Sequence, residues 1–157
     1  GIAANEAPAL ALGAALAPAG PPGRVIALPG DLGAGKTTLV KGLAAAWGIT
    51  TAITSPTFAI YTLYHGDRQL IHLDAYRLNS PAQAEDLCLS EFLRHPWCLA
   101  VEWPENVPPT WLHQAWTLEL SISPECPQQR HWHLSVPEPD APPQTLPGAT
   151  VQPDFRS

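Results

Sequence analysis

Residues 30–37, GDLGAGKT, are the feature of this chain that most constrains its fold. They fit the pattern G-x-x-x-x-G-K-[ST], in which glycines let successive backbone N–H groups turn towards one anion without a Cβ in the way. Lys36 would add a mobile positive charge for the outer phosphates, and the Thr37 hydroxyl is a ligand that Mg²⁺ accepts. The pattern therefore predicts a loop that binds a nucleoside triphosphate together with Mg²⁺.

The sequence on either side of this loop has the order that a phosphate-binding loop requires. Before it, residues 24–29 (RVIALP) form a short apolar run with β-branched side chains, which predicts a buried strand. After it, Leu39, Leu43 and Trp47 recur at helical spacing and a glycine follows, which predicts a helix that ends near residue 48. This strand–loop–helix context favours a true phosphate site over a chance glycine-rich turn.

The composition of the 157 residues limits the classes of protein to which the chain can belong. Hydrophobic residues make up 45% of the chain and charged residues 14%, which is typical of one globular domain. The net charge is −6 and the eight lysines and arginines are scattered along the chain. Extended binding to nucleic acid by this chain alone is therefore not expected.

The cysteines and the apolar runs bear on the compartment. Cys88, Cys98 and Cys126 have no paired spacing, which argues against a zinc site and against a disulfide framework. No apolar run approaches the roughly 20 residues that span a membrane, and no signal peptide is recognised. We therefore predict a cytoplasmic protein with reduced thiols and no membrane partner.

Apolar periodicity and turn residues predict the remaining elements. We expect helices at residues 6–17, 81–94 (one broken helix or two short ones) and 108–113. We expect strands at residues 59–64, 69–74, 97–101, 117–123 and 130–136, the first two joined by a tight turn. From residue 137 on, six of 21 residues are proline, so we predict one domain at residues 1–136 and a proline-rich tail at residues 137–157.

Two apolar runs end in a carboxylate that could serve the phosphate loop. Residues 70–74 (LIHLD) end at Asp74, and residues 98–102 (CLAVE) end at Glu102. Phosphate loops work with a carboxylate at the end of a neighbouring strand, which holds Mg²⁺ directly or through water. One carboxylate would hold the metal and the other would orient the attacking water, and the spacing alone does not assign these roles. Trp103 follows directly and could stack on the base or pack in the core.

Four short motifs together resemble one known family. They are GDLGAGKTT at residues 30–38, SPTF at residues 55–58, HLDAYRL at residues 72–78 and VEWPE at residues 101–105. In this order and at this spacing they resemble the TsaE (formerly YjeE) family of small bacterial ATPases, which are needed to make the threonylcarbamoyladenosine modification of tRNA. The resemblance covers about residues 10–136. It implies a single-domain α/β fold of the P-loop NTPase type, with a mixed β-sheet flanked by helices.

The resemblance also implies a function and partners. The expected activity is hydrolysis of ATP with Mg²⁺, slow until the TsaB–TsaD heterodimer is bound. Within that pair TsaD transfers the threonylcarbamoyl group to the adenosine next to the anticodon, and ATP hydrolysis would reset the pair between turnovers. The chain would then reach tRNA only indirectly, through the complex.

Individual residues take roles by the same resemblance. The phosphates would be held by Leu32, Gly33, Ala34, Gly35, Lys36, Thr37 and Thr38. Thr37 and Glu102 would ligate Mg²⁺. Asp74, near the γ-phosphate, would activate water, and Lys36 would act with it in catalysis.

Further contacts to the nucleotide are implied outside the loop. Trp103 and Glu105 would lie near the nucleotide, and Arg130 on the late strand would contact ATP. Residues 55–58 would act as a switch that senses the nucleotide. Relatives often carry a threonine near the position of Ala9, so one contact to the nucleotide is not expected here.

Three other functions stay open on the sequence. A small-molecule kinase shares this loop but usually closes an arginine-bearing lid over the phosphates, and no lid-like insertion is visible before Glu102. A GTPase would carry the guanine-reading motif N-K-x-D, yet no asparagine of this chain precedes a lysine. A scaffold that uses ATP only to set its shape would bind ATP without hydrolysing it.

Overall fold

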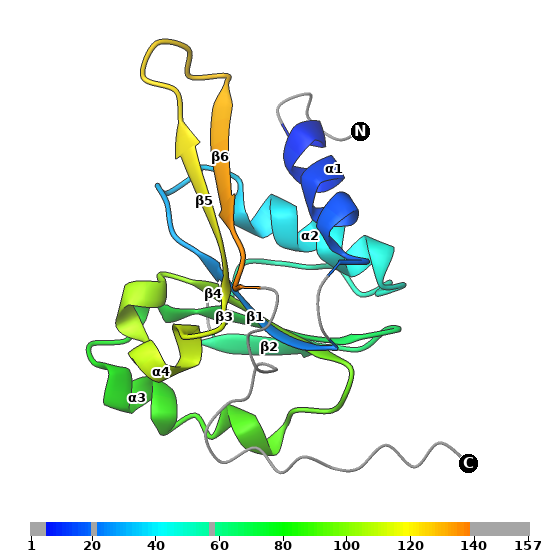
Figure 1. Cartoon of the computed structure of the whole chain (residues 1–157), viewed down its shortest axis with the longest axis vertical. Helices are drawn as coiled ribbons and strands as arrows, with labels where there is room; N and C mark the ends of the chain where they lie inside the picture. The colour runs from blue at the N-terminus through cyan, green and yellow to red at the C-terminus, as the bar shows by residue number, and fades with distance from the viewer. Residues whose placement is uncertain (1–5, 20–21, 57–58, 139–157) are drawn as a thin grey trace.

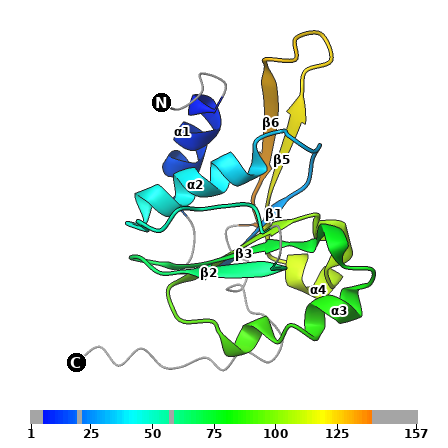
Figure 2. The same cartoon turned by 180° about the vertical axis from the view of Figure 1, so that it is seen from behind.

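A six-stranded sheet forms the centre of the molecule, and helices cover both of its faces (Figures 1 and 2). The computed structural model describes residues 6–19, 22–56 and 59–138. The strands are β1 Gly23–Leu28, β2 Tyr61–Tyr64, β3 Gln69–Asp74, β4 Trp97–Glu102, β5 Trp116–Ile122 and β6 Arg130–Ser135. The helices are α1 Ala7–Leu16, α2 Lys36–Ala46, α3 Pro81–Glu85 and α4 Pro109–Leu112, with 3-10 turns η1 Ala75–Arg77, η2 Leu89–Glu91 and η3 Pro104–Asn106.

The sheet is mixed, as expected for an α/β fold of this type. Its strand order is β2-β3-β4-β1-β5-β6. The four inner strands run parallel, while β2 and β6 pair antiparallel to their neighbours at the two edges. In the register of the inner strands, Glu102 of β4 is paired with Leu28 of β1 and with Asp74 of β3. The loop after β1 and both predicted carboxylates therefore meet at one edge of the sheet.

Side-chain alternation along β3 and β4 divides the core into two layers. Leu70 and Cys98 pack in the layer beneath α1 and α2, whereas Ile71 and Leu99 pack on the opposite face with Trp111 of α4. His72, Asp74 and Glu102 follow the phase of Leu70 and Cys98. The alternation therefore directs these three polar side chains towards α2, which starts at the phosphate loop (Figure 2).

Helix α1 packs against α2 through two glycines. A Cβ added to Gly13 would lie 2.2 Å from the carbonyl oxygen of Leu39, and one added to Gly42 would lie 2.2 Å from that of Leu10. Neither position has room for a side chain, so the two backbones are in direct contact. This contact holds the middle of α1 against the middle of α2, the helix that begins at the phosphate loop.

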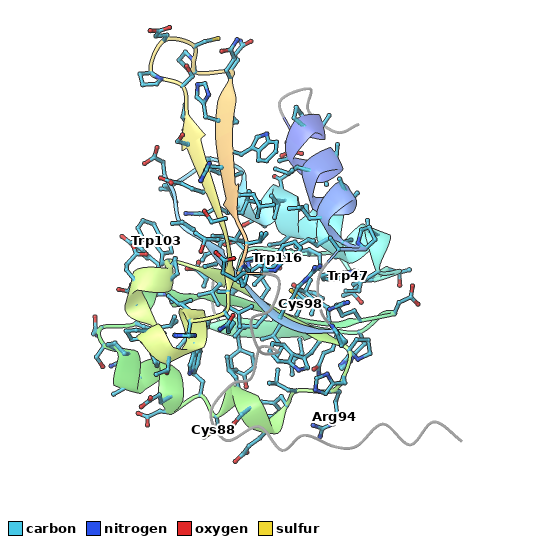
Figure 3. All side chains as sticks on the ribbon, in the orientation of Figure 1. Trp47, Cys88, Arg94, Cys98, Trp103 and Trp116 are labelled. Atoms are coloured by element: carbon cyan, nitrogen blue, oxygen red, sulfur yellow. The ribbon has the colours of Figure 1, made fainter. Side chains whose placement is uncertain are left out.

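Arg24 of β1 fixes the C-terminal end of α1. Its guanidinium donates to the carbonyl oxygens of Leu16 and Ala19 in the last turn of the helix and just beyond it. The same group lies 5.3 Å from the ring centroid of Trp47 and 5.0 Å from that of Trp116, and Figure 3 shows both tryptophans near the middle of the molecule. A cation is favourable at a helix C-terminus and over aromatic faces, so this buried arginine ties α1 to the sheet.

The elements expected from the sequence are present. Every predicted strand lies within two residues of its expected bounds, and residues 81–94 hold the short helix α3 and the turn η2 rather than one continuous helix.

All three cysteines are free thiols, and the described ranges contain no cluster of three His, Cys, Asp or Glu side chains suited to a metal such as zinc. None of the helices in these ranges is long and apolar enough to cross a membrane. The tail is described only through Glu138, so its separation from the domain stays a prediction.

Replacing Gly13 with alanine tests the contact between α1 and α2. We expect Gly13→Ala to lower the free energy of unfolding by about 1–3 kcal/mol, because the methyl group would press on the backbone of α2. Chemical denaturation measures this change. The control is Ala14→Ser at an exposed position of the same helix, which should stay within about 0.5 kcal/mol of the parent. A more stable Gly13→Ala variant, as helix propensity alone would give, contradicts the contact.

Candidate functional site

Three glycines give the loop after β1 its shape. Gly30, Gly33 and Gly35 have φ values of 133°, 78° and 108°, which side-chain-bearing residues rarely adopt. A Cβ on Gly30 would lie 2.0 Å from the carbonyl oxygen of Leu120 in β5, so this position accepts only glycine. Nothing lies within 4 Å of a Cβ built on Gly33. The loop is thus a concave backbone segment, open at Gly33, of the type that binds anions.

The loop leads directly into α2, whose N-terminus is not capped by a side chain. The N-cap residue is Gly35, so a ligand can use the free N–H groups of the first turn. Lys36 is buried, and its Nζ donates to the carbonyl oxygen of Gly30 at 2.8 Å across the loop. The ammonium group of Lys36 therefore lies inside the curve of the loop, where phosphate oxygens would need it.

Glu102 contacts the start of α2 from the end of β4. Its Oε1 accepts a hydrogen bond from the Thr37 hydroxyl at 3.0 Å, and Nε2 of His72 lies 3.0 Å from the same oxygen. Burial raises the pKa of Glu102, but the hydrogen bonds from His72 and Thr37 and the charge of Lys36 outweigh it and hold the pKa below its ordinary value. An ionised carboxylate beside a hydroxyl is an oxygen donor set that suits Mg²⁺.

Asp74 lies beside Glu102 but has different partners. The two residues are paired in the parallel register of β3 and β4. Oδ1 of Asp74 accepts from the backbone N–H of Tyr76 at 3.0 Å and so caps the turn η1. The structure therefore brings both predicted carboxylates to the loop, and only Glu102 bonds to Thr37.

A pocket of about 440 Å³ opens on the side of the loop that faces α1 and β6. Its walls come from three parts of the chain that are distant in sequence. Ala9 and Leu12 of α1 form one wall, and Arg130 and Trp132 of β6 form another. Residues 33–35 of the loop close its floor. Figures 1 and 2 show α1 and the β5–β6 hairpin rising from the same side of the sheet.

The predicted residues Arg130 and Thr38 therefore both line the pocket. The guanidinium of Arg130 donates to the carbonyl oxygen of Pro127 in the hairpin turn at 2.6 Å. Trp132, which the sequence did not single out, is 56% exposed and lines the same wall. Strand alternation is the signal that could have found it, because Arg130 and Trp132 are two residues apart on one strand and share a face.

Trp103 does not line this pocket and lies beside Lys36. Its ring centroid is 4.7 Å from Nζ of Lys36 and 5.0 Å from the ring of Tyr76. Figure 3 shows Trp103 at one edge of the molecule, apart from the other labelled tryptophans. Its φ of 58° lies in the left-handed region, an unfavourable conformation for a bulky residue, so the turn after β4 is strained beside Lys36.

Two other predicted residues, Leu32 and Glu105, are more peripheral. Leu32 is 84% exposed at the tip of the loop, and Ala34 behind it is buried. Glu105 is exposed on η3, and it does not line the pocket. The predicted switch segment, residues 55–58, is described only for its first two residues. Thr57 and Phe58 lie outside the described residues.

The comparisons with known proteins find the family that the sequence motifs resemble. A family model described as "Threonylcarbamoyl adenosine biosynthesis protein TsaE" matches residues 3–132. The tRNA threonylcarbamoyladenosine biosynthesis protein TsaE of Treponema pallidum is 45% identical over 85 residues, which cover 54% of this chain and 63% of that protein. Its counterpart in Bacillus subtilis is 47% identical over 83 residues, which cover 52% of this chain and 51% of that protein.

A solved structure extends the likeness to the fold. The crystal structure of Bacillus subtilis YdiB matches with a TM-score of 0.54 and 31% sequence identity, over 77% of this chain and 74% of that one. The matched region spans between half and two thirds of the length of the two curated relatives. Because the family model covers most of the sequence, this chain belongs to the TsaE family.

Proposed function

We propose that this chain is the ATP-binding and ATP-hydrolysing component of tRNA threonylcarbamoyladenosine synthesis. The observation that carries the proposal is the hydrogen bond of 3.0 Å between Thr37 and Glu102, which brings a hydroxyl and an ionised carboxylate together next to Lys36. The names of the curated relatives support the pathway. Absence of the guanine-reading motif from the sequence supports ATP rather than GTP.

The residues present fit a triphosphate and Mg²⁺. Residues 32–38 and the N-terminus of α2 would hold the phosphates, since they supply backbone N–H groups and the charge of Lys36. Thr37 and Glu102 would hold Mg²⁺. When bound, Mg²⁺ would neutralise negative charge on the phosphoryl oxygens.

Asp74, the remaining carboxylate, supports hydrolysis of ATP rather than transfer of its phosphoryl group to another substrate. Asp74 is half-buried next to Glu102, and only its Oδ1 has a hydrogen bond within the described ranges. Its second oxygen could accept a proton from a water molecule and orient it for attack. The sequence between the phosphate loop and Glu102 shows no lid-like insertion of the kind that a small-molecule kinase closes over the phosphates.

The pocket beside the loop would take the adenine base. Its apolar wall at Leu12 and the exposed ring of Trp132 suit a flat, uncharged ring, and Arg130 at its rim would face the negatively charged part of the nucleotide. The placement of Trp103 beside Lys36 fits a contact near the phosphates better than a stack on the base.

The partners would be TsaB and TsaD, and tRNA would be reached only through them. Purified chain should co-elute with the TsaB–TsaD heterodimer on size exclusion when ATP and Mg²⁺ are present, and phosphate release should rise when the heterodimer is added. Phosphate release that stays at background in the complex would support the scaffold function. Formation of a phosphorylated small molecule would support the kinase.

Replacing Lys36 tests the phosphate site. Lys36→Ala should weaken ATP binding tenfold or more, by about 1.5–3 kcal/mol, because a charge-assisted contact is lost. Calorimetric titration with ATP measures the affinity. Lys41→Ala removes the same charge from the next turn of α2 and should bind ATP like the parent. Equal affinities for the two variants would reject the loop as the phosphate site.

Replacing Glu102 tests the metal site. Glu102→Gln should raise the Mg²⁺ concentration needed for half-maximal phosphate release about ten- to a hundredfold, because a neutral amide is a poor ligand for a hard cation. Glu105→Gln makes the same chemical change on the exposed turn η3 and should leave this concentration unchanged. The metal role of Glu102 fails if both variants shift it by the same factor.

Replacing Trp132 tests the base pocket. Trp132→Ala should lower the affinity for ATP by about 1–3 kcal/mol, the range found for stacking of a base on an aromatic side chain. The affinity for inorganic tripolyphosphate, which has no base, should not change. His133→Ala, at the neighbouring exposed position on the other face of β6, is the matched control. A parallel loss of tripolyphosphate affinity would place the effect of Trp132 on the loop instead of the base.

A further inference from the structure

His72 is a buried polar side chain beside the candidate metal site. His72 lies in β3 and is fully buried, with 0% of its surface exposed. Its Nε2 is 3.0 Å from Oε1 of Glu102. The other ring nitrogen, Nδ1, is buried and has no hydrogen-bond partner among the described residues. Among the described residues His72 therefore has one polar contact, which is with Glu102.

This arrangement is costly if packing is all that it provides. A carboxylate oxygen only accepts hydrogen bonds, so the proton of this contact lies on Nε2. Burying the ring with Nδ1 unpaired costs free energy that an apolar side chain would avoid. Leu70, two residues earlier on the same face of β3, fills its place in the core with no such cost. The bond to Glu102 is thus what a histidine adds at this position.

Glu102 needs a fixed orientation because a second carboxylate lies beside it. Asp74 is its register partner on β3 and points to the same face, so the two negative charges would repel each other. His72 donates from the same strand as Asp74 and holds Oε1 of Glu102 on the side of the core. Thr37 donates to the same oxygen from α2. Oε2 of Glu102 accepts no hydrogen bond from the described residues and is left for another ligand.

We propose that His72 is a positioning residue, whose Nε2–H holds Oε1 of Glu102 so that Oε2 is presented to a divalent cation. The proposal rests on the proposed function, because it takes Glu102 as a ligand of Mg²⁺. Loss of a partner that hydrogen-bonds a metal ligand from behind typically lowers metal affinity about ten- to a hundredfold.

Three substitutions of His72 separate the hydrogen bond from the packing. His72→Gln keeps an amide N–H close to the position of Nε2. His72→Asn has the same amide on a shorter side chain that ends near the position of Nδ1. His72→Phe keeps the ring and removes the donor. Leu70→Val, a change in the same strand and the same core layer away from Glu102, is the control for a general loss of stability.

The experiment measures the ATP affinity of each variant by calorimetry at a series of Mg²⁺ concentrations. A parallel titration in EDTA gives the ATP affinity without metal. We expect His72→Asn and His72→Phe to raise the half-saturating Mg²⁺ concentration about ten- to a hundredfold, with unchanged metal-free ATP affinity. His72→Gln should restore most of the Mg²⁺ affinity. Leu70→Val should lower the melting temperature and leave the Mg²⁺ dependence as in the parent.

Each outcome bears on the proposal. A parent-like Mg²⁺ dependence in His72→Asn and His72→Phe overturns the positioning role alone, because the parent still binds ATP with Mg²⁺. A parent chain whose ATP binding does not respond to Mg²⁺ overturns the proposed function and the role of His72 together. If His72→Phe does not fold, the comparison of glutamine with asparagine decides, and equal Mg²⁺ dependence in these two variants rejects the proposal.

Discussion

The hydrogen bond between Thr37 and Glu102 is the contact on which the arrangement of the site depends. It joins the first turn of α2 to the end of β4 through two residues that are 65 positions apart in sequence. Two regular features of the fold bring the groups together. The parallel register sets the ends of β1, β3 and β4 level with one another, and strand alternation turns Glu102 towards α2 rather than into the opposite core layer. A shift of β4 by one residue would point this carboxylate to the wrong face of the sheet.

The pocket beside the loop depends on a different set of contacts. Its α1 wall is held in the middle by the glycine contact with α2 and at its C-terminal end by Arg24, which binds the last carbonyl oxygens of the helix. Its other wall is the β5–β6 hairpin, which pairs with the rest of the sheet only through β5. Gly30 fits closely against Leu120 of β5, so the loop and the hairpin are packed against each other at the floor. The phosphate side of the site is therefore set by the inner sheet, and the pocket is set by helix packing and by one hairpin.

The sequence predicted the parts of this structure that depend on local patterns. The glycines and Lys36 of the loop follow a fixed spacing, and the strands that end at Asp74 and Glu102 are recognisable as apolar runs. Trp132 was not predicted, because its place in the pocket depends on how α1 and the hairpin approach the loop from distant parts of the chain. His72 stands in one of the recognised motifs, but its burial and its contact with Glu102 arise only once β3 and β4 are paired. Pairing of strands and packing of helices are non-local, and a periodic pattern in one segment does not contain them.

The sequence left open which carboxylate would hold the metal, and the two side chains have different hydrogen-bond partners. One oxygen of Glu102 accepts hydrogen bonds from two side chains. These bonds keep the pKa of Glu102 below its ordinary value although burial raises it. Asp74 uses one oxygen on a backbone N–H in its own turn and has no bond to α2 in the part of the chain that is described. A group with fixed donors behind it is suited to hold a cation in one place, whereas a group with one free oxygen at the sheet edge is suited to accept a proton from a mobile water. The two residues are equivalent in sequence position, each the last residue of a parallel strand, and their surroundings make them chemically different.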